Sequence, residues 1–368
     1  MTSFIPHFLA ETTSVAKGVV RPDDAPFVAV VAFPAFIDTS PFFCLEPFRL
    51  GNDFDGFAGW DNDVGINPIT SHQQPCCKNV NLCDTGLMTK ANIKIIAESL
   101  NDSVPATHEL YKSGNMASLR ELAKYQDEQG AVYIDVKVGS FPSDFFVQVI
   151  REVQSATKKP LALDSPDPAL IEAGLKAYDD SIGLPILNSI SPLRMELFEL
   201  YKLKKFRPIL LISEGESGAC HTADETMESA KLLLAKAKVA GIPNEDLIFD
   251  PGVAPIGSDS EGNLVRLMET MRRLHADPTF AGFHASVGLS NFTVMLPPKR
   301  KDGSPVRSPL ESAFLTRTMP LGLDYVIGSV KRNYEILPDD HPAQQCFDDC
   351  VKLGGFDAIM RVKKFYKG

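Results

Sequence analysis

Polar side chains stand directly after four apolar runs of this chain, where their types and spacing suit joint chemistry. The four segments are Leu163-Asp164-Ser165, Leu187-Asn188-Ser189, Phe249-Asp250-Pro251 and Gly288-Leu289-Ser290-Asn291. If the apolar runs are parallel strands of one sheet, their carboxyl ends lie along one rim. The two carboxylates and two amides then meet around one opening.

This set of side chains suits a flat, nitrogen-rich heterocycle. A carboxylate accepts hydrogen bonds, whereas an amide both donates and accepts them, and such a ring offers donors and acceptors along its edge. The pattern therefore predicts a pterin-like ligand. Structural alternatives stay open: Asp164 and Asn188 are also good helix caps, and Asp250 and Asn291 are also common turn residues.

Further polar residues fall near other predicted strand ends. They are Glu98 and Asn101 after the first strand, Asp135 and Lys137 on the second, and Ser213 and Glu214 at the end of the fifth. We expect Glu98, Asn101, Lys137 and Ser213 to line the same rim. Lys137 would place a cation at the top of its strand.

Strand-like and helix-like segments alternate from about residue 93 onward. The predicted strands are 93–97, 132–138, 161–164, 185–188, 208–213, 247–250, 280–287 and 324–327. The predicted helices are 116–129, 144–157, 168–178, 193–204, 223–240, 263–275, 308–319 and 343–353. Eight such units with short, apolar strands predict an α/β fold, a (β/α)8 TIM barrel whose active site lies at the carboxyl ends of the strands. A doubly wound open sheet is the alternative, but it usually carries a glycine-rich loop after its first strand, and residues 97–101 contain no glycine.

Residues 1–92 differ in kind from the predicted barrel of residues 93–368. They are rich in Phe, Pro, Gly and Asn, include Trp60 and show little helical periodicity. Because each aromatic side chain gains about 1.5–3 kcal/mol on burial, we expect this extension to pack on the barrel or in an oligomer interface. A homodimer is the expected assembly.

Composition and charge exclude several classes of protein. The 368 residues are 44% hydrophobic and 23% charged, as in ordinary globular proteins. A net charge of −10 argues against nucleic-acid binding. The sequence has no run of about 18 apolar residues that would cross a membrane and no basic segment typical of a signal peptide, so a cytoplasmic location is expected.

The seven cysteines are expected to be reduced thiols in that compartment. Cys76, Cys77 and Cys83 form a cluster that could ligate zinc, but the spacing matches no standard zinc module. We therefore expect no bound metal.

Six segments carry a resemblance that no single strand end establishes. They are GAVYIDVKVG (130–139), PLALDSPDPALIEAG (160–174), LNSI (187–190), GIPNEDLIFDP (241–251), VGLSNFTVMLP (287–297) and residues 314–327. In order and spacing the stretch 93–328 resembles the pterin-binding methyltransferases that move a methyl group between methyltetrahydrofolate and a corrinoid protein.

The resemblance implies roles for individual residues. Asp164, Asn188 and Asp250 would hold the pterin edge, and Asn291 would hydrogen-bond near N5, the nitrogen that carries the methyl group. The corrinoid (cobalamin) would arrive on a partner protein, with tetrahydrofolate or 5-methyltetrahydrofolate as the second substrate.

Two positions depart from the family pattern, because Lys137 stands where an Asn is usual and Ser99 where an Arg is common. These departures motivate an alternative, a non-catalytic pterin-binding or scaffold subunit of a methyl-transfer complex. A dihydropteroate synthase is a further alternative, but its Asn-x-Thr-Pro-Asp-Ser-Phe and Ser-x-Arg-x-His stretches are missing.

Overall fold

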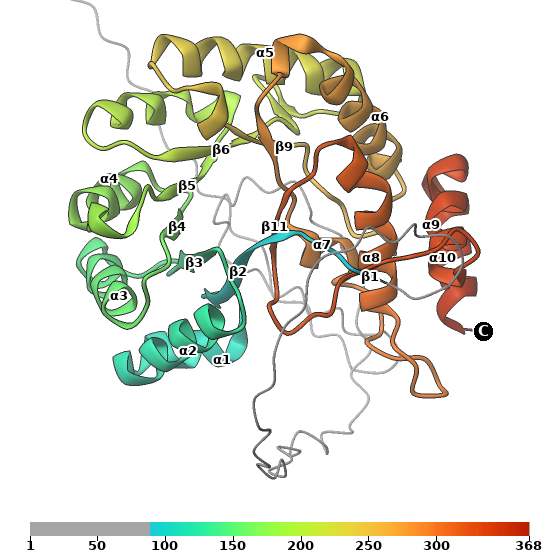
Figure 1. The fold of residues 1–368 in the computed structure, drawn as a ribbon, viewed down its shortest axis with the longest axis horizontal. Coiled ribbons are helices and arrows are strands. Elements are labelled where there is room, and N and C mark those ends of the chain that lie inside the picture. The colour runs from blue at the N-terminus through green and yellow to red at the C-terminus, as the bar shows by residue number, and fades with distance from the viewer. Residues whose placement is uncertain (1–88, 368) are drawn as a thin grey trace, which may run out of the picture. The chain divides into compact units, whose positions relative to one another are not determined.

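Eight parallel strands form the central sheet of the computed structural model, which describes residues 89–367 (Figure 1). In spatial order the sheet runs β10-β9-β6-β5-β4-β3-β2-β11. The strands are β2 (Lys94–Asn101), β3 (Tyr133–Lys137), β4 (Leu161–Asp164), β5 (Ile186–Ile190), β6 (Arg207–Leu211), β9 (Ile248–Asp250), β10 (His284–Ala285) and β11 (Tyr325–Gly328). Parallel bridges from Ala285 to Leu323 and from Gly288 to Ile327 join the two outer strands. The predicted (β/α)8 barrel is therefore confirmed.

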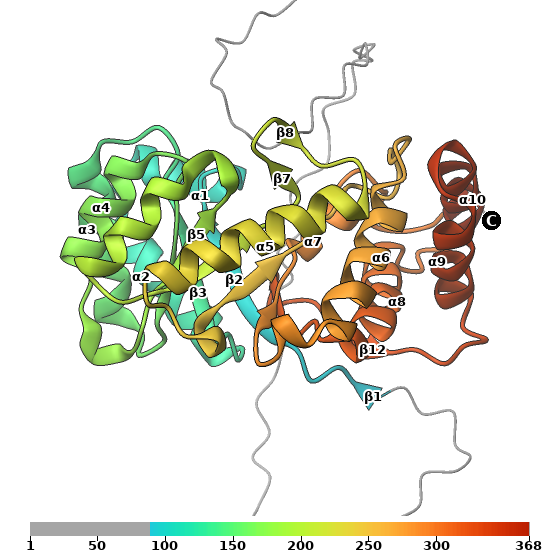
Figure 2. The same ribbon diagram turned by 90° about the horizontal axis from the view of Figure 1, so that it is seen from above.

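Helices surround the sheet on its outer side (Figures 1 and 2). The α-helices are α1 (Pro105–Lys112), α2 (Met116–Glu128), α3 (Ser143–Ala156), α4 (Pro168–Ala177), α5 (Ala223–Val239), α6 (Asn263–Ala276), α7 (Leu289–Thr293), α8 (Arg307–Thr318), α9 (Pro342–Leu353) and α10 (Gly355–Lys367). Short 3-10 segments are η1 (Asp180–Ile182), η2 (Pro192–Lys202), η3 (Asn244–Asp246), η4 (Pro278–Phe280) and η5 (Met319–Leu321). Two small antiparallel pairs, β1 (Thr89–Lys90) with β12 (Glu335–Ile336) and β7 (Glu214–Gly215) with β8 (Gly218–Ala219), complete the described elements.

The strands alternate between an inner and an outer face, as a pleated strand must. Tyr133, Ile186 and Ile248 belong to the buried cluster that fills the barrel. Their neighbours Ile134 and Leu187 belong instead to the cluster between strands and helices. A residue two places after an inner residue also faces inward. The residues two places after these three are Asp135, Asn188 and Asp250, so each strand has an inward-facing polar side chain toward its carboxyl end.

Two predicted elements were wrong in type or length. Residues 193–204 were predicted as a regular helix, but η2 is a 3-10 segment with non-helical angles at Arg194 (φ −140°, ψ 40°). Residues 280–287 were predicted as one long strand, but η4 occupies the start and only His284–Ala285 are strand. Gly282 has a φ of +84°, and because an extended strand requires negative φ, the strand cannot include this residue and starts only after it.

Three helices were not predicted from the sequence. They are α1, the five-residue α7 and the C-terminal α10. Figure 2 places α9 and α10 side by side at the outer edge, beyond α6 and α8.

Several expectations fall on residues 1–88, outside the described part of the chain. They include the packing of the N-terminal extension, Trp60, and the cluster Cys76, Cys77 and Cys83. Where the description begins, β1 pairs with β12, and Ala91 N–H donates to Tyr334 O at 2.9 Å. Within residues 89–367, no helix has the length and apolar character that crossing a membrane requires.

Candidate functional site

The ends of β3, β4 and β5 bring four polar side chains together at the carboxyl end of the barrel. Asp164 pairs in register with Asn188, and Lys137 Nζ lies 3.6 Å from Asp164 Oδ2. Asp135 lies two residues before Lys137 on β3 and so deeper in the barrel, and its Oδ1 is 3.5 Å from Asn188 Nδ2. Three residues that the sequence assigned to the site thus form one contiguous group, with Asp135 beneath them.

Asp135 is the fully buried member of this group. Its side chain is 0% exposed, and its Oδ2 has no hydrogen-bond partner among the described residues. Burial, together with the nearby Asp164 carboxylate, raises the pKa of Asp135 well above its ordinary value, against the attraction of Lys137. A protonated Asp135 carboxyl donates a hydrogen bond as well as accepting one.

Asp250 ends β9 on the other side of the opening. Its Oδ1 accepts the Gly252 N–H at 2.8 Å, and Ser286 Oγ lies 3.5 Å from its Oδ2. Burial raises the pKa of Asp250 to about 7, although the hydrogen bond from Gly252 acts against this shift. Near neutral pH the Asp250 carboxyl therefore exists in both protonation states.

The loop after Asp250 is packed closely against Ser213. Gly252 has a φ of +66°, and a Cβ at this position would lie 2.4 Å from Ser213 Oγ. Arg266 supports the loop from behind by donating to Pro251 O at 2.9 Å. The predicted site residue Ser213 therefore lies beside the Asp250 loop.

Asn291 lies on the short helix α7, which follows β10. Its side chain is exposed, and a Cβ on Gly288 would lie 2.8 Å from Asn291 Nδ2. The preceding residue, Ser290, makes a hydrogen bond with the carboxylate of Glu98, which lies within β2 and not after the first strand as predicted. Burial raises the pKa of Glu98, and the hydrogen bond from Ser290 and the charge of Arg332 oppose the shift.

The structural alternatives for the strand-end residues have different outcomes. Helix α4 is capped by Asp167 and η2 by Ser191, so neither Asp164 nor Asn188 is a cap. Asp250 does accept a turn hydrogen bond from the residue two places later. Asn101, in register with Lys137, accepts the Ser103 N–H at 2.9 Å and so has a local turn role at the rim.

Sequence reasoning missed the residues that support the site. Arg266 and Ser286 stand beside Asp250, while Glu311 and Arg332 stand behind α7. Arg266 and Glu311 lie on predicted helices. A charged residue in an amphipathic helix is expected to be on the solvent-exposed face. Only contact with another element shows that they are buried.

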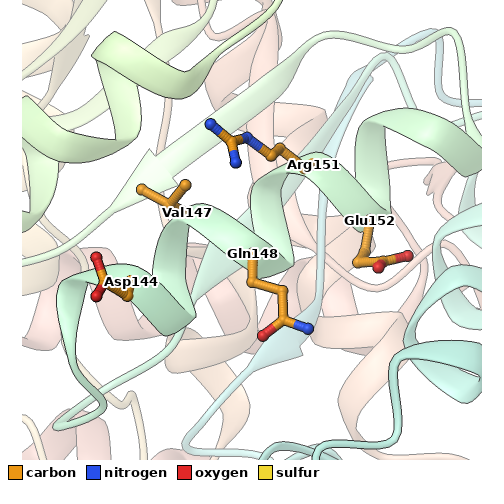
Figure 3. Close-up of a pocket in the computed structure, with 5 residues that line it drawn as sticks. All are labelled: Asp144, Val147, Gln148, Arg151 and Glu152. Carbon is orange, nitrogen blue, oxygen red and sulfur yellow. The ribbon is translucent and has the colours of Figure 1, made fainter.

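Two depressions of the molecular surface lie away from the strand ends. One is formed by the outer face of α3, where Asp144, Val147, Gln148, Arg151 and Glu152 project from successive turns (Figure 3). The other lies among residues 274–283, Leu321 and Gly322, near the amino end of the short strand β10. Neither includes a residue that the sequence assigned to the site.

The side chains at the carboxyl end of the barrel are of the types that the edge of a pterin requires. The 2-amino group and ring N–H of a pterin donate hydrogen bonds, and ionised carboxylates such as those of Asp164 and Asp250 are acceptors. The carbonyl and unprotonated ring nitrogens accept, which suits Asn188 and a protonated carboxyl. The buried Oδ2 of Asp135, which no described residue hydrogen-bonds, adds a further polar group at the base of this set. Residues 89–367 contain no group of three or more His, Cys, Asp or Glu side chains arranged to hold a metal ion.

Comparisons with known proteins identify the family of the chain. The family model described as "Pterin binding enzyme" matches residues 107–328. The chain is also similar to a methylcorrinoid:tetrahydrofolate methyltransferase of Eubacterium limosum, with 26% identity over 243 residues, which is 63% of this chain and 83% of the relative. The matched region holds β3 to β11 and thus most of the polar strand ends. The chain belongs to the family of pterin-binding enzymes.

Proposed function

We propose that the protein is a methyltransferase that moves a methyl group between N5 of tetrahydrofolate and a corrinoid carried by a partner protein. The observation that carries this proposal is that Asp164, Asn188 and Asp250 all stand at the carboxyl ends of parallel strands, at one end of the barrel, as expected for a pterin site. The name of the Eubacterium limosum relative supports the choice of substrates and favours transfer from the methylcorrinoid to tetrahydrofolate.

In this proposal Asp164, Asn188 and Asp250 bind the pterin edge and orient the ring. Lys137 keeps a positive charge beside Asp164, and Glu98, Asn101 and Ser213 line the remaining rim. The bound pterin would cover the buried polar atoms of Asp135 and Asn188 and exclude water from them. The corrinoid, when docked, supplies the cobalt that gives up or receives the methyl group.

Asn291 is the proposed catalytic residue. Its amide donates a hydrogen bond at N5, where charge changes as the N–methyl bond forms or breaks. An aligned donor of this kind contributes about 3–4 kcal/mol to transition-state stabilisation. Asn291 is exposed on α7, which leaves its side chain free to contact a substrate.

Calorimetric titration with tetrahydrofolate tests the pterin site. We expect one molecule bound per chain, and an affinity lower by about tenfold or more in Asp164→Asn and in Asp250→Asn, because each loses an ionic acceptor. Asp324→Asn is the matched control, since Asp324 is a half-buried carboxylate bonded to His284 Nδ1 (2.6 Å) and Lys94 (3.0 Å) near the other end of the strands. Equal losses in all three variants would contradict the assigned position of the site.

The Asn291→Ala variant tests the catalytic role separately. Turnover in a methyl-transfer assay should fall by about a hundredfold or more, while the dissociation constant for tetrahydrofolate changes by no more than a few-fold. Normal turnover in this variant would remove Asn291 from the mechanism. Tetrahydrofolate binding with no methyl transfer by the wild-type protein would favour the scaffold alternative.

A further inference from the structure

Two carboxylates, the fully buried Glu311 and the half-buried Glu98, contact the helix that carries Asn291. Glu98, within β2, makes a hydrogen bond with Ser290, and Glu311, on α8, makes one with Thr293. Ser290 and Thr293 are three residues apart and so lie on one face of α7. Asn291 lies between them and is exposed, whereas Thr293 and Glu311 are 0% exposed.

Arg332 supplies the positive charge that both carboxylates face. Its Nε lies 3.4 Å from Glu311 Oε2, and its charge also acts on Glu98. Arg332 lies in the loop after β11 and also reaches Ser308 at the start of α8, at 3.4 Å. The group thus connects β2, α7, α8 and the loop that follows β11.

Apolar packing already holds α7 against the barrel. Leu289 is 0% exposed and Phe292 1% exposed, and Phe292 packs on Phe314 with ring centroids 5.0 Å apart. Placing the buried Glu311 carboxylate, with the half-buried Glu98 and Arg332 side chains, next to this contact costs desolvation energy that further apolar side chains would avoid. Directional hydrogen bonds fix a helix in rotation and along its axis more narrowly than apolar contacts do. The arrangement therefore favours accurate placement of α7 over stability alone.

We propose that Glu98 and Glu311 are positioning residues, which fix α7 through Ser290 and Thr293 so that the Asn291 amide points at the reacting nitrogen, with Arg332 as their shared counter-charge. The role of Asn291 in this inference rests on the proposed function. The contacts by which the two carboxylates fix α7 are independent of that function. Because misplacing a reacting group by about 1 Å costs up to about a hundredfold in rate, the effect on turnover should be large.

Three variants test the tie between Thr293 and Glu311. Thr293→Val removes the hydroxyl at nearly constant volume, and Thr293→Ser retains it. Thr318→Val is the matched control, because Thr318 is also a fully buried threonine of the same region, and its hydroxyl donates to Phe314 O at 2.8 Å within α8.

Hydrogen exchange of the peptide covering residues 288–296 gives a readout independent of activity. The amides of Asn291 and Leu296 are bonded to Gly288 O and Thr293 O, both at 3.0 Å, so they report opening of α7. We expect exchange about tenfold faster in Thr293→Val and unchanged in Thr293→Ser and Thr318→Val. Unchanged exchange in Thr293→Val would overturn the positioning proposal.

Methyl-transfer kinetics give the second readout. We expect kcat to fall by about tenfold to a hundredfold in Thr293→Val, with KM for tetrahydrofolate within about twofold, and to recover in Thr293→Ser. An equal loss of kcat in Thr318→Val would show a general stability effect and overturn the proposal. If the wild type transfers no methyl group, the proposed function fails, while the exchange measurement still tests the hold on α7.

Discussion

Individual side chains at this site owe their properties to burial. Asp250 illustrates this, because burial raises its pKa to about 7, whereas an unfolded chain leaves an Asp near its ordinary value of 3.8. Between these two pH values the native Asp250 retains a proton that the unfolded chain has released. The free energy of unfolding therefore decreases as pH rises through this interval.

Asp250→Asn tests that linkage. The variant cannot lose a proton at this position. The difference in free energy of unfolding, variant minus wild type, should therefore increase by up to roughly 4 kcal/mol between pH 4 and pH 8. The Asn carbonyl can still accept the Gly252 N–H, which limits other effects. Urea denaturation at a series of pH values measures the difference. A difference that does not change with pH would show that Asp250 titrates near its ordinary pKa.

The residue types of the site were readable from the sequence, but their environments were not. Asp164, Asn188 and Asp250 stand out because a polar residue directly follows an apolar run. The sequence places Asp135 on a strand but does not show that one of its oxygens is buried with no hydrogen-bond partner within residues 89–367. Glu311 and Arg332 were missed because their contacts join segments more than 15 residues apart, which no local pattern records.

At the scale of elements, the loop after β9 depends on close approach of its backbone to the Ser213 side chain. Gly252 meets this need, since a Cβ there would lie 2.4 Å from Ser213 Oγ. Gly241, at the C-terminal end of α5, has a similar φ of +76°, but a Cβ at that position would have nothing within 4 Å. Substitution of the two glycines therefore distinguishes the free-energy cost of a side chain at positive φ from the cost of the steric contact with Ser213.

Gly252→Ala should destabilise the protein more than Gly241→Ala does. Both variants incur about 1 kcal/mol for a positive φ, and overpacking should add about 1–3 kcal/mol in Gly252→Ala alone. Thermal denaturation followed by circular dichroism measures both. Equal losses would mean that Ser213 moves away at little cost and that the loop is not tightly packed.

Most elements were predictable because their hydrophobic periods are clear. The strands β3, β4 and β9 match their predicted ranges to within about two residues. The failures have local physical causes: Gly282 interrupts the predicted seventh strand, and η2 adopts non-helical angles at Arg194, whose guanidinium lies 3.2 Å from Ser189 Oγ. The helix α7 is too short for periodicity to reveal.

At the scale of the whole barrel, closure depends on a strand of only two residues. Near the amino end of β10, His284 Nδ1 bonds to Asp324 at 2.6 Å, and Lys94 pairs with the same carboxylate at 3.0 Å. Arg207 Nη1 reaches Tyr325 at 3.1 Å from the opposite side. These contacts connect β10, β11, β2 and β6 where backbone hydrogen bonds are few.

Asp324→Ala should therefore lower stability with little effect on the distant site. Burial alone would raise the pKa of Asp324, but the bonds from His284 and Lys94 outweigh it and hold the pKa below its ordinary value. The stabilisation that the ionised Asp324 carboxylate contributes is present above about pH 4 and is lost as pH falls through its lowered pKa. We expect a loss of about 2–3 kcal/mol at pH 7 that shrinks in acid. A loss of the same size at pH 3 would contradict an ionic role.

The fold class was predictable from the whole chain because eight repeated units leave few alternatives. Assembly was not, since an interface leaves no period in the sequence. The homodimer stays a prediction that analytical ultracentrifugation can check.

Single-turnover transfer between defined substrates tests the proposed reaction most directly. The wild-type protein is mixed with tetrahydrofolate and methylcob(III)alamin, and the visible spectrum is followed under anaerobic conditions. We predict loss of the methyl-Co(III) spectrum, appearance of Co(I) and an equal amount of methyltetrahydrofolate, at a rate that Asn291→Ala lowers by about a hundredfold. An unchanged spectrum, both with the free corrinoid and with a methylated corrinoid protein, would contradict methyl transfer by this chain.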